Sequence, residues 1–143
     1  EWNAPGYLPD RVWLSGPGNL RLSHAKITVA DQNNDGRGDI ALLYDYGDAT
    51  SGLFVFDSGQ WSTPGYMPSR VWYSDPGNWD WSRSIILSGA DQDGDGLTEL
   101  AMLYDYGSAT TALYQLDPVD EYKPDIKWNS GPGNWDGSLT KPI

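Results

Sequence analysis

The sequence contains no cysteine, and it has only one histidine, two phenylalanines and two methionines in 143 residues. Without cysteine, neither a disulfide framework nor a thiolate metal site is available to stabilise the fold. Basic residues are also few, because nine Lys and Arg stand against twenty acidic residues, and seventeen of these are Asp. The resulting formal net charge of −11 repels phosphate groups, so we expect no nucleic-acid partner.

Long hydrophobic runs are also missing. No apolar stretch approaches the roughly 20 residues that span a bilayer, so we expect no membrane insertion. The first residues, Glu1, Trp2 and Asn3, do not begin a signal peptide. We expect a secreted protein from which the signal has been removed, and the lack of cysteine does not argue against an oxidising compartment.

An internal repeat organises the chain. Residues 2–19 and 61–78 are identical at twelve of eighteen positions, and residues 31–53 and 91–113 at thirteen of twenty-three. A third copy begins at Trp128 and stops early. We therefore read residues 1–143 as one unit of two and a fraction repeats of about 60 residues. Its parts are repeat 1 (1–60), repeat 2 (61–119) and a partial repeat 3 (120–143).

Each repeat contains four short apolar segments separated by Gly, Pro, Asn and Asp, a pattern typical of strands joined by turns. In the first repeat we expect strands at Lys26–Ala30, Asp39–Tyr46, Ser51–Phe56 and Val71–Ser74. In the second we expect them at Ser84–Ala90, Glu99–Tyr106, Thr110–Leu116 and Ile126–Asn129. β-Branched and aromatic residues dominate these segments, which disfavours helices.

The fold class that we predict is all-β, with propeller-type blades of four antiparallel strands. Two blades are too few to close a ring, since propellers typically have about four to eight. We expect completion by homo-oligomerisation, with a trimer of six blades as the first guess, or a fragment of a longer array. A further strand-like segment at Arg11–Trp13 leaves the strand count uneven, and it either pairs across a subunit boundary or frays.

Two Asp-rich loops carry the most specific chemistry. Residues 31–39 and 91–99 share the pattern D-x-[DN]-x-D-G-x-x-[DE]. Side-chain oxygens at positions 1, 3, 5 and 9 and a carbonyl at position 7 suit a hard cation that takes six to eight oxygens, which favours Ca²⁺ over Mg²⁺. The loop differs from an EF-hand because position 12 is Leu42 or Met102. The alternative is a plain Asp-Gly hairpin with solvated carboxylates.

This hairpin, in repeats of this length, resembles the FG-GAP or VCBS repeats of integrin α-subunits and of propeller lectins. The resemblance implies two structural Ca²⁺ ions with no chemistry of their own. It implies ligands at Asp31, Asn33, Asp35, Arg37 and Asp39, and at Asp91, Asp93, Asp95, Leu97 and Glu99, with Arg37 and Leu97 contributing carbonyls. The Phe-Gly and Gly-Ala-Pro signatures are absent, and Tyr-Asp-Tyr-Gly follows the second strand instead.

A second recurring motif is W-x-S-x-P-G-N, which Trp-Asp follows in the last two copies. Pro-Gly signals a turn, so we expect the Trp and Asp after it to project from a rim loop and to bind a sugar ring and its hydroxyls. The candidate sugar-binding residues are Asn78, Trp79, Asp80, Trp81, Asn134, Trp135 and Asp136, with Asp45, Tyr46, Asp105 and Tyr106 of the Tyr-Asp-Tyr-Gly turns. The alternatives are that these tryptophans pack within the fold and that Asp45 and Asp105 accept turn N–H groups. We expect Trp2, Trp13, Trp61, Trp72 and Trp128 to be wedges between blades.

The function predicted from these features is a secreted, multivalent, carbohydrate-binding module, a lectin stabilised by calcium. We expect no enzyme activity, because the sequence has no phosphate loop, nucleophile elbow or zinc-ligand cluster, and because the regularly spaced acids belong to the proposed metal loops. The alternatives are a protein-binding or adhesive propeller and a non-catalytic accessory fragment of a larger secreted hydrolase.

Overall fold

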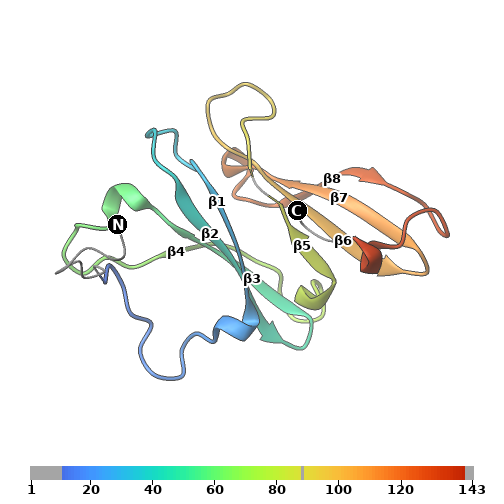
Figure 1. Ribbon diagram of the computed structural model, residues 1–143, viewed down its shortest axis with the longest axis horizontal. Coiled ribbons are helices and arrows are strands. Elements are labelled where there is room, and N and C mark those ends of the chain that lie inside the picture. Colours follow the sequence, from blue (N-terminus) through green and yellow to red (C-terminus); the bar gives the residue numbers. More distant parts are fainter. Residues whose placement is uncertain (1–10, 88, 141–143) are drawn as a thin grey trace, which may run out of the picture.

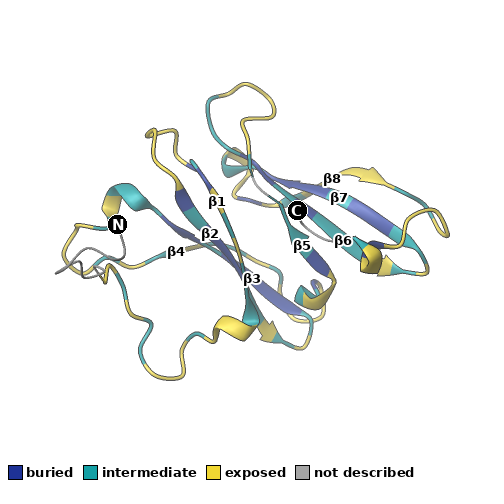
Figure 2. Cartoon of the chain, viewed as in Figure 1, coloured by how far each residue is buried: buried dark blue, intermediate teal, exposed yellow. Residues whose placement is uncertain are grey.

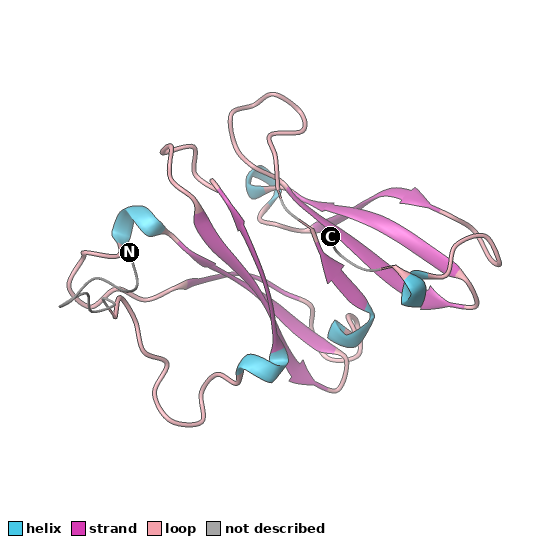
Figure 3. Ribbon diagram, viewed as in Figure 1, coloured by secondary structure: helices cyan, strands magenta, loops and turns pink. Residues whose placement is uncertain are grey.

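The computed structural model describes residues 11–87 and 89–140, which contain eight strands and five single-turn 3-10 helices but no α-helix (Figures 1 and 3). The strands are β1 (Ala25–Ala30), β2 (Asp39–Gly47), β3 (Thr50–Phe56), β4 (Ser69–Tyr73), β5 (Ser84–Ile86), β6 (Leu100–Gly107), β7 (Thr110–Leu116) and β8 (Pro124–Asn129). The 3-10 helices are η1 (Leu22–His24), η2 (Ser58–Gln60), η3 (Trp81–Arg83), η4 (Pro118–Asp120) and η5 (Gly137–Leu139). In this part of the chain, no helix has the length and hydropathy to cross a membrane.

The strands form two antiparallel sheets, a first sheet in the order β1-β2-β3-β4 and a second sheet in the order β5-β6-β7-β8. They lie side by side, and the described residues do not close them into a ring (Figure 1). The outermost strand of the first sheet, β4, comes from repeat 2, so each sheet crosses the boundary of its sequence repeat. The prediction of an all-β fold with four-stranded antiparallel sheets is confirmed.

Two expected strands differ in the structure. The strand predicted at Ser84–Ala90 ends at Ile86, and pairing resumes only as an isolated bridge between Ala90 and Glu99. Repeat 2 has one residue more than repeat 1 in this segment, and the extra residue interrupts the ladder. The segment Arg11–Trp13 forms no strand.

Both central hairpins turn in the same way. Asp48 and Ala49 join β2 to β3 with φ of 51° at both positions, and Ser108 and Ala109 join β6 to β7 with φ of 54° and 50°. Positive φ at both central residues matches the right-handed twist of the flanking strands. The Asp before each turn stabilises it, as described for the candidate site below.

The core lies between the two sheets (Figure 2). The first sheet contributes the odd-numbered face of β2 and β3, namely Ala41, Leu43, Leu53 and Val55. The second sheet contributes the even-numbered face of β6 and β7, namely Leu100, Met102, Ala112, Tyr114 and Leu116. We call these the inner faces, and the opposite faces of the same strands the outer faces. The sheets thus stack with unlike faces in contact.

Trp79 is the wedge of this core. Only 7% of it is exposed, and its ring lies 4.7 Å from Tyr104, 5.0 Å from Tyr114 and 5.5 Å from Trp72, measured between centroids. The indole Nε1 donates a hydrogen bond to Ser84 Oγ at 2.8 Å, so the buried polar atom has a partner. Trp79 therefore joins β4 of the first sheet to β6, β7 and β5 of the second.

The other tryptophans expected to be wedges have different surroundings. Trp72 packs against the core, and Trp13 contacts Phe56 edge-on at 5.3 Å between centroids. Trp61 is half-buried, whereas Trp128 is 42% exposed. Trp2 lies outside the described residues.

We predict that Trp79→Ala lowers the free energy of unfolding by about 3–5 kcal/mol, because it removes a large buried side chain and leaves a cavity between the sheets. The matched control is Trp135→Ala, the same position one repeat later, which is 49% exposed. The control should change stability by at most about 0.5 kcal/mol. Urea titrations followed by circular dichroism measure both effects, and equal losses would contradict the wedge assignment.

Candidate functional site

The two Asp-rich loops lie at the same edge of the two sheets. Residues 31–38 connect β1 to β2, and residues 91–98 precede β6; both loops project at the top of Figure 1. They approach each other closely, since a Cβ built on Gly96 would lie 3.1 Å from Asn34 Nδ2. The edge therefore concentrates the acidic residues of both repeats.

Backbone N–H groups hold each loop in a coil around its own carboxylates. In the second loop, Asp91 Oδ1 accepts from Gly94 N at 2.6 Å, Asp93 Oδ1 accepts from Asp95 N at 3.1 Å and Asp95 Oδ1 accepts from Leu97 N at 2.8 Å. Gly94 and Gly96 have φ of 85° and 93°, which a residue with a side chain rarely adopts.

The first loop forms the corresponding coil. Asp31 accepts from Asp35 N at 3.1 Å and from Gly36 N at 2.9 Å, and Asp35 accepts from Arg37 N at 2.9 Å. Asn33 Oδ1 also accepts from Asp35 N at 3.1 Å. The two loops therefore share one backbone design.

The loops differ at their last ligand position. Asp39 is fully buried, and both of its oxygens are satisfied: Oδ2 accepts from Gln32 N at 3.1 Å and Oδ1 from Ser58 N at 2.7 Å. Both oxygens of this buried carboxylate are thus paired with backbone donors. The donor Ser58 is the first residue of η2, directly after the N-cap Asp57.

Glu99 occupies the same position in the second loop and is also fully buried. Its Oε2 accepts from Gln92 N at 2.5 Å, but its Oε1 has no hydrogen-bond partner within the described part of the chain. Pro118, the first residue of η4, stands where η2 has Ser58, and proline has no N–H to donate. A buried carboxylate oxygen without a partner lowers the stability of the folded state. A cation bound at this place would remove that penalty.

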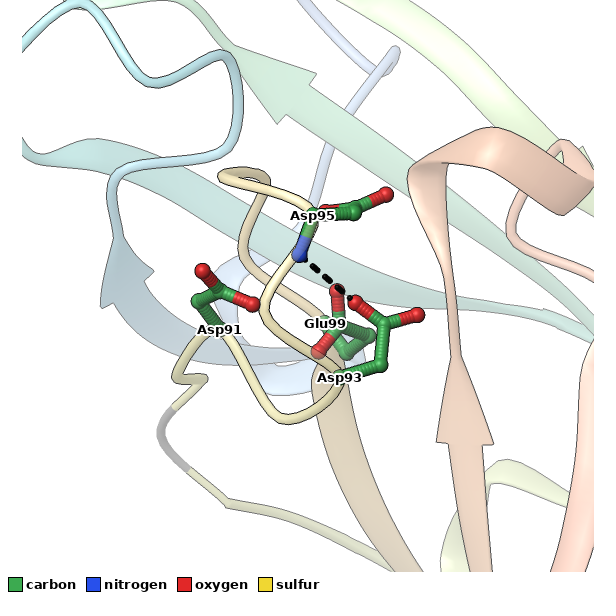
Figure 4. Close-up of side chains that lie close together, drawn as sticks. All are labelled: Asp91, Asp93, Asp95 and Glu99. Carbon is green, nitrogen blue, oxygen red and sulfur yellow. Dashed lines mark hydrogen bonds between the residues drawn. The ribbon is translucent and has the colours of Figure 1, made fainter.

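The acids of the second loop converge. One oxygen each from Asp91, Asp93, Asp95 and Glu99 lies within 4.8 Å of the others, as Figure 4 shows around the bond from Asp95 N to Asp93. Three carboxylates are exposed and one is buried, so a cation could enter from solvent and reach the unpaired oxygen. No other group of three or more such residues gathers in this way within residues 11–87 and 89–140. The ligand set predicted for the first loop stays a prediction.

The tryptophans predicted to bind sugar lie mainly inside the fold. The prediction that Trp79 projects from a rim loop is wrong, because the chain after the Pro-Gly turn folds back between the sheets: Trp79 N donates to Ala49 O at 2.9 Å. Trp81 is half-buried, and its Nε1 donates to Leu43 O at 3.1 Å. Trp135 is exposed, and its Nε1 donates to Thr140 Oγ1 at 3.2 Å.

The polar residues predicted around these tryptophans have structural partners. Asp80 and Asp136 are N-caps of η3 and η5, where their Oδ1 atoms accept from Ser82 N at 2.9 Å and Ser138 N at 3.0 Å. The bonds from Ser82, aided by Arg83, lower the pKa of Asp80.

The amide residues of the same motifs lie at the ends of the Pro-Gly turns. Asn134 Nδ2 donates to Ser130 O at 2.8 Å, which fastens the turn. Asn78 is exposed, and its backbone N donates to Asp75 O at 3.4 Å.

The Tyr-Asp-Tyr-Gly turns keep an exposed aromatic surface. Asp45 Oδ1 accepts from Gly47 N at 2.8 Å and Asp105 Oδ1 from Gly107 N at 2.7 Å, so each Asp uses one oxygen to hold its turn. Tyr46 is 45% exposed and Tyr106 is 46% exposed. Part of each tyrosine ring is thus exposed, whereas the preceding Asp points to the opposite face of its sheet.

Sequence reasoning missed three residues that decide the site. Ser58 and Pro118 lie two residues after β3 and β7, and comparing the two copies at these positions was the available signal. Lys26 was missed because the second copy has Ile85 there. Its Nζ donates to Trp81 O at 2.6 Å and to Ser84 O, and it lies 4.1 Å from the Trp81 ring centroid. Burial lowers the pKa of Lys26, while Asp80 and Asp45 oppose the shift.

Comparison with known proteins adds no assignment to this geometry. No protein-family model matches the chain, and no curated protein or solved structure matches it.

We predict that Ser58→Pro lowers the free energy of unfolding by about 1–2 kcal/mol in chelator, because Asp39 Oδ1 loses its donor. Proline is tolerated at the first position of such a turn, as Pro118 demonstrates in η4. The control Ser58→Ala keeps the N–H and removes a hydroxyl that has no partner, so it should be nearly neutral. Chemical denaturation with excess chelator measures both, and an unaffected Ser58→Pro would contradict the role given to this N–H.

Proposed function

We propose that the protein is a non-catalytic, calcium-stabilised module of the β-propeller type that binds carbohydrate outside the cell. The observation that carries the proposal is the buried Glu99 carboxylate, with Oε1 unpaired, among Asp91, Asp93 and Asp95. The propeller-type arrangement is supported by two like sheets that stack with unlike faces in contact.

Calcium is the cation that this site favours. Its ligands would be carboxylate oxygens on a flexible loop, together with the Leu97 carbonyl, and Ca²⁺ accepts many such oxygens in irregular geometry. Mg²⁺ requires a nearly ideal octahedron and retains several waters. Two bound Ca²⁺ ions, one in each loop, would reduce the formal charge from −11 to −7. The role of the ion is structural: it neutralises Glu99 and fixes the loop before β6.

Carbohydrate binding is supported by the two Tyr-Asp-Tyr-Gly turns. Tyr46 lies 5.2 Å from Tyr44 and 5.7 Å from Tyr73 between ring centroids, and both contacts are edge-on. Tyr106 lies 5.0 Å from Tyr104, and its hydroxyl bonds that of Tyr114. These contacts hold each exposed ring in place for the apolar side of a sugar. Two equivalent sites per chain would give multivalent binding.

We predict that Ca²⁺ raises the melting temperature of chelator-treated protein, with about 2.7 kcal/mol of added stability when the free ion is at 100 times its dissociation constant. Glu99→Gln should remove most of this response, because it replaces the unpaired carboxylate. The control Asp39→Asn should keep the response of the second loop, although it lowers the starting stability. Scanning calorimetry with and without Ca²⁺ measures the shifts; no shift, together with no metal by elemental analysis, would exclude the proposed ion.

We predict that binding to a glycan array is competed by a simple sugar and falls about tenfold, or about 1.4 kcal/mol, in Tyr46→Ala and Tyr106→Ala. Val119→Ala is the control, since Val119 is 65% exposed on η4, at the strand ends opposite the turns. If the array shows no binding while pull-down recovers a protein, the module is adhesive or protein-binding instead.

A further inference from the structure

The outer face of the first sheet has the same residue types as the inner face of the second. Leu42, Tyr44, Phe54 and Phe56 correspond in the repeat to Met102, Tyr104, Tyr114 and Leu116. The latter four pack against the first sheet and the Trp79 wedge within the chain. The first sheet thus offers, on its outer face, the surface that a preceding sheet would cover.

The outer face of the second sheet has the same residue types as the inner face of the first, so it could pack on the outer face of another first sheet. Ala101, Leu103 and Leu113 correspond to Ala41, Leu43 and Leu53, which are completely buried between the sheets. In the second sheet all three remain half-exposed. A groove of about 550 Å³ opens there beside Leu103, where Gly137 replaces the Trp81 that covers Leu43.

The second sheet carries a pair of partly exposed indoles in the same arrangement as the pair that forms the wedge between the sheets. Trp128 and Trp135 lie 5.9 Å apart at 86°, and Trp72 and Trp79 lie 5.5 Å apart at 83°. The two pairs occupy equivalent positions in the repeat. Trp79 inserts between Tyr104 and Tyr114, whereas Trp135 is 49% exposed and contacts no following sheet.

Residues 11–20 occupy the outer face of the first sheet incompletely. Trp13 takes the place of Trp72 and contacts Phe56, but Leu20 stands where the equivalent segment has Trp79. A cavity of about 230 Å³, lined by Trp13, Leu20, Phe54 and Phe56 among others, remains under this segment. Residues 11–20 therefore imitate a preceding sheet, but among these residues no indole takes the place equivalent to that of Trp79.

We infer that a second copy of this chain binds head to tail, with its Trp128–Trp135 pair on Tyr44 and Phe54 of the first copy, in place of residues 11–20. This inference rests on the propeller-type assembly proposed above and names its interface and its competitor. The contact is heterologous, because different faces of the two copies meet, so every copy retains one free face of each kind until the assembly closes. The fit repeats the packing that Trp79 makes within the chain.

Charge modulates this association. Each copy carries −11, so copies repel one another until salt screens them or calcium reduces the charge. Association should therefore strengthen when Ca²⁺ and salt are raised. The docking faces themselves are apolar, so added salt does not weaken their contact.

Light scattering on the full chain, over a range of protein concentrations in Ca²⁺ and salt, tests the inference. The wild type should form assemblies larger than the 15.8 kDa monomer. Trp135→Ala should weaken association at least about 30-fold, as loss of a central interface Trp does. Leu20→Trp should also weaken it, because it fills the cavity with the chain's own indole, and it should raise the melting temperature of the monomer. Val119→Ala should change neither property.

A cysteine cross-link distinguishes head-to-tail contact from a symmetric dimer, since the chain has no cysteine of its own. An equimolar mixture of Trp135→Cys and Tyr44→Cys should form disulfide-linked dimers on oxidation, whereas neither variant alone should. A monomeric wild type, unchanged association in Trp135→Ala and Leu20→Trp, or dimers of Trp135→Cys alone would each overturn the inference. The calcium-induced melting shift, measured on the same samples, reports on the proposed function independently.

Discussion

The insertion of the Trp79 indole between the two sheets is the contact on which the rest of the structure depends. A four-stranded sheet of this size has apolar residues on both faces, and it is unstable until another layer covers them. Trp79 reaches from the end of β4 to Tyr104 and Tyr114 and so fixes the spacing of the sheets. The linker that carries it also places Trp81 over Leu43 and brings Lys26 into the junction. The loops and turns at the sheet edges are positioned by this packing.

The two Asp-rich loops have the same backbone design, but their buried carboxylates differ in the number of hydrogen-bond donors that they receive from the chain. Asp39 accepts hydrogen bonds from two N–H groups of its own chain, one of them from η2. Glu99 has one such donor, and Pro118 removes the other. In the first loop, both oxygens of the buried carboxylate therefore have donors within the chain. In the second loop, one oxygen of the buried carboxylate has no donor within the described residues, and this is the oxygen that the proposed cation would bind.

Much of this architecture could be predicted from the sequence, because the repeat period and the turn residues mark the strands directly. The segment Asp39–Tyr46 is a short apolar run with Asp at its start and Gly47 after it, so the strands and their antiparallel order could be predicted. The positions of the tryptophans did not follow. The turn before Trp79 predicts a projecting loop, whereas the chain folds back because the neighbouring sheet offers an aromatic cleft. The oxygen of Glu99 that lacks a partner among the described residues was also beyond prediction, since it depends on Pro118, nineteen residues later in the chain, which stands where the first repeat has the donor Ser58.

The two described sheets of each copy constrain the number of sheets in the assembly inferred above. Because each copy contributes the same pair of sheets, any closed ring made of whole copies contains an even number of them. The rotation from one sheet to the next within the chain must then divide a full turn an even number of times, or successive copies will spiral into an open filament. A small change in the angle at which Trp79 holds the sheets apart would thus decide between a finite particle and a fibre.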